Sequence, residues 1–125
     1  MLPKESKIMV VDDMKMIRTA IKQYLGQLGY QNTVEASNGK EAIEKFDTES
    51  PDFVFMDIVM PVMTGDQALT EIRKKNKATP IVMLTSVAEE SMVKECISAG
   101  ITGYALKPIN AENGPQVLSE FLNKA

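Results

Sequence analysis

Residues 8–13 of the chain read Ile-Met-Val-Val-Asp-Asp, four apolar residues followed by two acids. An apolar run that ends in a charged or hydroxylated side chain returns three times further along the chain. Residues 53–57 read Phe-Val-Phe-Met-Asp, residues 81–85 read Ile-Val-Met-Leu-Thr, and residues 104–107 read Tyr-Ala-Leu-Lys. Continuous apolar runs of this length predict strands that are buried on both faces, as in a parallel sheet. They indicate an α/β fold.

Helical patterns lie between the strands and after the last of them. Apolar residues recur at helical spacing within residues 16–28, 42–46, 68–72, 93–97 and 117–122. Gly29 and Gly100 stand where the first and fourth of these helices are expected to end. On the fourth helix we expect Val93, Cys96 and Ile97 to face the core.

Strands that alternate with helices imply right-handed crossovers and a parallel sheet covered on both faces. Residues 32–36 and 102–106 mix polar with apolar side chains, which is typical of edge strands, whereas the other three strands are apolar throughout. We therefore predict a single doubly wound sheet of five parallel strands in the order 2-1-3-4-5, flanked by five helices, a flavodoxin-like architecture. The length of the chain predicts one domain over residues 1–125.

The composition excludes several classes of function. The chain has no histidine, which removes Ser-His and Cys-His hydrolases and most zinc sites. Its net charge of −3 gives no electrostatic basis for direct binding to nucleic acid. No apolar run is long enough for membrane insertion, and residues 1–5 lack a signal-peptide core. The single cysteine, Cys96, can form no internal disulfide, so we expect a cytoplasmic protein.

Five polar side chains follow the predicted strands directly: Asp12, Asp13, Asp57, Thr85 and Lys107. In doubly wound sheets ligands bind at the carboxyl ends of the strands, where the strand order reverses, here between the first and third strands. Two carboxylates about 4 Å apart repel by roughly 4 kcal/mol at an effective dielectric near 20. A cluster of three therefore needs a proton or a cation, and oxygen ligands suit Mg²⁺, with Mn²⁺ as a substitute.

Each of these residues also has a simpler interpretation when it is taken singly. Asp12 and Asp13 could cap the first helix, and Lys107 could be a solvated lysine. Asp57 could be a loop residue after a buried strand, Thr85 could be a turn residue, and Tyr104 could be an edge-strand aromatic. The simpler interpretations do not account for polar residues at the ends of four strands at once.

Jointly, these motifs resemble those of the receiver domain of two-component response regulators, over essentially the whole chain. The matching stretches are Val-Asp-Asp at 11–13, Met-Asp-Ile-Val-Met-Pro-Val-Met-Thr-Gly at 56–65, Leu-Thr-Ser at 84–86 and Tyr-Ala-Leu-Lys-Pro at 104–108. The resemblance is to chemotaxis-type, single-domain members of that family.

The resemblance implies a function and a set of site residues. Asp57 would accept a phosphoryl group from a phosphohistidine of a sensor histidine kinase or a phosphotransfer protein. Asp13, Asp57 and the backbone carbonyl of Val59 would bind Mg²⁺, with Asp12 supporting the ion through water. Lys107 and Thr85 would hold phosphoryl oxygens, and the Lys107-Pro108 peptide bond would be cis.

The resemblance also implies a switch. Thr85 would move toward the phosphoryl group and Tyr104 would rotate inward, which would change the surface of the fourth helix, fifth strand and fifth helix for binding a downstream target protein. The protein would be a regulatory phosphoacceptor and not an enzyme, although it would catalyse its own phosphotransfer and slow autodephosphorylation. It would be a monomer or a weak, phosphorylation-dependent dimer. Val59 and Val87 stand where the family often has polar side chains near the attacking water, and we therefore predict that autodephosphorylation is slow.

Three other functions fit the residues less well. A phosphatase or mutase with an aspartyl-phosphate intermediate would carry a second aspartate two residues after its first, where this chain has Met14. A flavin or nucleotide carrier would need glycines or hydroxyls after the first strand, and residues 11–15 have none. A docking module that works without phosphorylation would not need the complete set of polar strand ends.

Overall fold

The computed structural model describes residues 2–125, which fold into alternating strands and helices. The strands are β1 (Ile8–Val11), β2 (Thr33–Ala36), β3 (Phe53–Met56), β4 (Ile81–Thr85) and β5 (Gly103–Leu106). The helices are α1 (Lys15–Gln27), α2 (Gly39–Glu49), α3 (Gly65–Lys75), α4 (Glu90–Ala99) and α5 (Gly114–Leu122). None of the helices within the described residues is long and apolar enough to cross a membrane.

The strands form one parallel sheet in the order β2-β1-β3-β4-β5, which confirms the predicted topology. β1, β3 and β4 are buried along their whole length, whereas β2 and β5 are partly exposed. This difference follows from position, because an edge strand has a neighbour on only one side. The mixed composition of the second and fifth strands was therefore a correct signal of the sheet edges.

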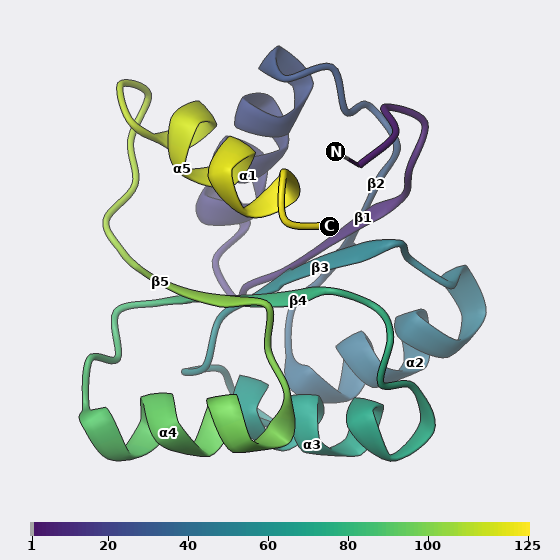
Figure 1. Ribbon diagram of the computed structural model, residues 1–125, viewed down its shortest axis with the longest axis vertical. Coiled ribbons are helices and arrows are strands. Elements are labelled where there is room, and N and C mark those ends of the chain that lie inside the picture. Colours follow the sequence, from purple (N-terminus) through teal and green to yellow (C-terminus); the bar gives the residue numbers. More distant parts are fainter. Residues whose placement is uncertain (1) are drawn as a thin grey trace.

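The helices cover both faces of the sheet in two layers (Figure 1). α1 and α5 lie on one face, and α2, α3 and α4 lie on the other. Successive side chains of a strand point to opposite faces, so each buried strand supplies two cores. In β1, Ile8 and Val10 pack in the cluster beneath α1 and α5, while Met9 and Val11 pack in the cluster beneath the other three helices.

Two helices end at the predicted glycines. Gly29 and Gly100 have φ angles of 95° and 109°, a backbone conformation that glycine adopts without a steric penalty.

The apolar pattern of α1 was less reliable at its start. Met16, the first residue of that pattern, is 74% exposed, because it lies in the first turn of α1 at the margin of the apolar stripe.

The predicted core face of α4 was wrong by one position. Cys96 is buried, but Ile97 is 61% exposed and Val93 is only half-buried. The residues that pack against the core are Met92, Cys96 and Ala99, spaced four and three residues apart. A helix turns by about 100° per residue, so a stripe centred on Cys96 in this register leaves Ile97 on the solvent side.

Candidate functional site

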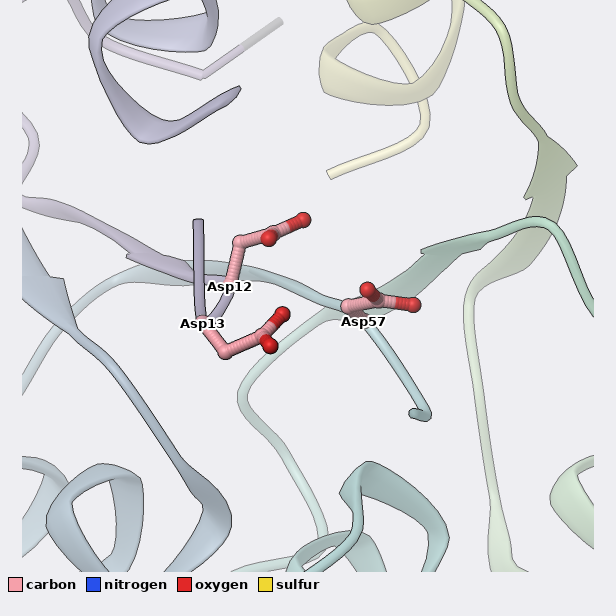
Figure 2. Close-up of side chains that lie close together, drawn as sticks. All are labelled: Asp12, Asp13 and Asp57. Atoms are coloured by element: carbon pink, nitrogen blue, oxygen red, sulfur yellow. The ribbon is translucent and has the colours of Figure 1, made fainter. Parts of the chain in front are cut away.

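Three carboxylates meet where β1 and β3 end. Val11 and Met56 are paired in adjacent parallel strands, so the residues that follow them emerge side by side. Asp12, Asp13 and Asp57 each offer a carboxylate oxygen, and these oxygens lie within 4.8 Å of one another (Figure 2). Asp12 and Asp57 are buried, whereas Asp13 is exposed. The cluster lies at the point where the strand order reverses, which is where a doubly wound sheet binds its ligands.

Lys107 reaches the cluster from the segment after β5. Its Nζ donates to Asp12 Oδ2 at 2.6 Å and to Asp57 Oδ2 at 3.1 Å. The Lys107 backbone N–H donates to the Thr85 carbonyl at 2.8 Å, which fixes the start of this segment against β4. The Lys107-Pro108 peptide bond is cis, as predicted. One ammonium group is therefore shared by two buried carboxylates from different strands.

Burial and the neighbouring charges shift the pKa values of Asp12 and Lys107 in opposite directions. Burial raises the pKa of Asp12, and this effect outweighs the hydrogen bonds from Lys107 and the Met14 backbone. Burial also lowers the pKa of Lys107, but its hydrogen bond to Asp12 and its attraction to Asp57 together raise it above the ordinary value. The lysine therefore stays charged, and Asp12 carries an ionisation penalty that a second cation would relieve.

The backbone holds the acids in place. The Asp57 N–H donates to the Val11 carbonyl at 2.9 Å, and Asp57 Oδ1 accepts from the Ile58 N–H at 2.7 Å. Gly65, the first residue of α3, approaches this segment so closely that a Cβ there would lie 1.9 Å from the Asp57 carbonyl oxygen. The Gly65 N–H donates to the Ile58 carbonyl at 2.9 Å. Only glycine permits this contact between the start of α3 and the strand end that carries Asp57.

Thr85 and Tyr104 are connected through the backbone of one residue, Val87. Thr85 is fully buried, and its Oγ1 accepts from the Val87 N–H at 3.3 Å. The Tyr104 hydroxyl donates to the Val87 carbonyl at 2.6 Å, and burial raises the pKa of Tyr104. The segment after β4 therefore contacts both side chains that the sequence assigned to a switch. The Tyr104–Val87 hydrogen bond was not foreseen, because its acceptor is a backbone atom that no side-chain pattern marks.

Val59 lies in the exposed loop between β3 and α3, and its side chain is 62% exposed.

Sequence reasoning did not identify Arg18, whose Nη1 donates to the backbone carbonyl of Asp12 at 2.7 Å. A signal was present, because a cation in the first turn of a helix is disfavoured by the helix dipole unless it has a partner. Arg18 occupies such a position in α1.

Comparison with known proteins shows the family to which the chain belongs. The profile of the family described as the response regulator receiver domain matches residues 8–119. The chain belongs to the response regulator receiver domain family. The receiver domain is 38% identical over 117 residues to the chemotaxis protein CheY of Bacillus subtilis, covering 94% of this chain and 98% of that protein.

Solved structures of receiver proteins share the fold. CheY4 of Vibrio cholerae, a chemotaxis response regulator, matches with a TM-score of 0.83 at 33% identity, over 94% of this receiver domain and 98% of that chain. A CheY chain in a CheX-CheY-BeF3-Mg complex from Borrelia burgdorferi matches with a TM-score of 0.86 at 26% identity, over 94% and 87% of the two chains. The receiver domain is thus CheY-like, and its family acts in two-component signalling through partner kinases and downstream targets.

Proposed function

We propose that this receiver domain, extending over residues 1–125, is switched by phosphorylation of Asp57. The observation that supports this most strongly is the convergence of three carboxylates and one lysine at the ends of β1, β3 and β5. An acid within hydrogen-bond reach of an ammonium group, beside two further acids, is suited to receive a phosphoryl group. The buried strands that carry it hold this geometry before the donor arrives.

The site fits a divalent cation by its donor chemistry. Its ligand atoms are carboxylate oxygens, which hard cations such as Mg²⁺ and Mn²⁺ prefer. Three carboxylates and one ammonium group leave a net charge of −2, which one divalent cation balances. Asp13, Asp57 and the Val59 carbonyl would bind the ion, with Asp12 supporting it through water. When bound, Mg²⁺ supplies positive charge that offsets the negative charge of the phosphoryl oxygens.

The transfer step needs few groups. An Asp57 carboxylate oxygen attacks phosphorus as the bond between phosphorus and the donor imidazole nitrogen breaks, which leaves an acyl phosphate on Asp57. Lys107 already contacts Asp57 and would move its Nζ to a phosphoryl oxygen. The Thr85 hydroxyl, at the end of the neighbouring strand β4, would donate to another phosphoryl oxygen. The Borrelia burgdorferi relative was solved in a complex that contains Mg²⁺ and BeF3, which supports Mg²⁺ as the proposed cation.

The Val87 contacts support a route from Asp57 to the surface. Movement of Thr85 toward a phosphoryl group would break its hydrogen bond with the Val87 N–H and shift the segment that accepts from Tyr104. Tyr104 would respond because its hydroxyl partner moves, and the surface of α4, β5 and α5 would change with it. The added charge of the acyl phosphate is the driving force.

The partners follow from this chemistry. A sensor histidine kinase or phosphotransfer protein supplies the phosphoryl group, and a downstream target protein binds the altered surface. We place the protein in the cytoplasm, as a monomer or a weak phosphorylation-dependent dimer without nucleic-acid contacts. It is a regulatory phosphoacceptor, and the adjacent acids Asp12 and Asp13, followed by Met14, argue against the phosphatase or mutase alternative.

The direct test is incubation with acetyl phosphate and Mg²⁺, followed by intact mass measurement. We expect a gain of one phosphoryl group in the native protein and none in Asp57→Asn. Asp47→Asn is the matched control, because Asp47 is an exposed acid paired with Lys75 far from the cluster, and it should be modified normally. Modification of Asp57→Asn to the native extent would contradict the proposal.

The loss of the phosphoryl group tests the proposed slow autodephosphorylation. In this step water attacks phosphorus, phosphate leaves and the Asp57 carboxylate is restored. Val59 lies in the loop after β3 and offers no side-chain hydrogen bond to that water. We expect Val59→Asn to shorten the half-life of phosphorylated Asp57, measured by intact mass after removal of the donor. An unchanged half-life would show that Val59 does not limit hydrolysis.

A further inference from the structure

We propose that Arg18 is a positioning residue for the cation site, a role that rests on the proposed function of that site. Arg18 lies in the first turn of α1 and its side chain is 14% exposed. Its guanidinium group spans two elements. Nη1 donates to the Asp12 carbonyl at 2.7 Å, and Nε donates to Glu35 Oε1 of β2 at 3.0 Å.

The contact with Asp12 controls the direction of Asp13. The carbonyl of Asp12 and the N–H of Asp13 belong to one planar peptide unit. The preceding N–H of Asp12 is already held by the Ala36 carbonyl at 3.1 Å, at the end of the β1–β2 pairing. Arg18 therefore restrains the next peptide unit, beyond the sheet, from which the exposed Asp13 side chain departs toward Asp57.

Arg18 is itself held in place by its surroundings. Glu35 accepts from Arg18 through one oxygen and from Lys22 through the other, at 3.1 Å. The pKa of Glu35 is lowered, because hydrogen bonds from Lys22 and Arg18 outweigh the opposing effect of burial. The carboxylate stays ionised near neutral pH and fixes the planar guanidinium, which is suited to two directed hydrogen bonds. β2 is in this way connected to the acids at the end of β1.

The electrostatic effect of Arg18 and its proposed orienting effect predict opposite changes in cation affinity when Arg18 is mutated. Arg18 is a cation close to the acids, so removing its charge should strengthen the binding of a divalent cation if electrostatics were its only contribution. If Arg18 orients the Asp12–Asp13 segment, its removal should weaken binding. Residues that orient metal ligands typically contribute about 10-fold to 100-fold in affinity. The direction of the change therefore separates the two explanations.

The experiment is Mn²⁺ titration followed by the electron paramagnetic resonance signal of the free ion, a measurement independent of phosphorylation. We expect Arg18→Met to raise the dissociation constant about 10-fold. Arg18→Lys keeps the charge but lacks the planar guanidinium that makes the two directed hydrogen bonds to Asp12 and Glu35, so we expect it to weaken binding as well. Lys22→Met is the matched control: it removes a cation paired with the same Glu35 and should leave the affinity equal or slightly higher.

The outcomes separate this inference from the proposed function. If the native protein does not bind Mn²⁺, or if Asp13→Asn binds it equally well, the cation site itself is wrong and this inference falls with it. If the site is present and Arg18→Met or Arg18→Lys binds within twofold of the native protein, only the role of Arg18 is refuted. If Lys22→Met weakens Mn²⁺ binding as much as Arg18→Met does, the role of Arg18 is also refuted. Circular dichroism confirms that each variant is folded, and Arg18→Lys carries the test if Arg18→Met does not fold.

Discussion

Replacing Lys107 with methionine should destabilise the protein in the absence of divalent cations. Methionine is similar in length to lysine and lacks its charge. Lys107 Nζ lies 2.6 Å from Asp12 Oδ2 and 3.1 Å from Asp57 Oδ2. At an effective dielectric near 20, these two attractions amount to about 6 and about 5 kcal/mol before the cost of burying the charges. Without the lysine, two buried carboxylates face each other with no cation between them.

The net effect is smaller than the sum of those attractions. Removing one partner of a buried ion pair typically costs about 3–5 kcal/mol, because the remaining charge has no compensation. The Lys107 side chain is 18% exposed, so water compensates part of the loss and we expect about 3 kcal/mol. The loss should shrink in acid, since protonation removes carboxylate charge, and the raised pKa of Asp12 favours its protonation.

Urea unfolding in buffer containing a chelator measures this difference. The matched control is Lys75→Met, because Lys75 pairs with Asp47 at a site where the two side chains are 66% and 50% exposed. Exposed pairs contribute about 0–1 kcal/mol, so the control should be nearly as stable as the native protein. Saturating Mg²⁺ should recover much of the stability of Lys107→Met, because the ion replaces the missing positive charge. If both variants are equally stable without Mg²⁺, our account of the buried charges is incorrect.

Three further predictions concern single positions. Gly65→Ala should lower the free energy of unfolding, measured with urea, by at least about 2 kcal/mol, because the alanine Cβ would lie 1.9 Å from the Asp57 carbonyl oxygen. Val62 has a φ of 69° and is 77% exposed, and asparagine adopts this left-handed conformation more readily than valine. Val62→Asn should therefore raise the free energy of unfolding by about 1 kcal/mol, whereas Val59→Asn in the same loop should not raise it. Burial raises the pKa of Cys96 from 9.0 to about 11. The unfolded chain therefore loses this proton first, and the native protein should lose roughly 2 kcal/mol of stability relative to Cys96→Ala between these two pH values.

The sheet order could be predicted because burial on both faces has a signature in composition. A strand with neighbours on both sides and helices above and below has few polar positions: β1 and β3 have none, and β4 has only its final residue, Thr85. The edge strand β2 contains Thr33 and Glu35 because one side of that strand meets solvent. The acids, Thr85 and Lys107 could be found for a related reason, since each lies at or just after the end of a strand and strand ends share one edge of the sheet.

Contacts that depend on rotation about a helix or on backbone atoms could not be read in this way. Ile97 and Met92 fit an apolar helix equally well, and only the packing of α4 against the core selected Met92. The acceptors for Arg18 and Tyr104 are backbone carbonyls, which every residue carries, so residue type does not reveal them. Local patterns of residue type thus specify the order of the strands and the chemistry at their ends. Which side chains hold that chemistry in place depends on distances between separate elements, and these arise only when the layers pack together.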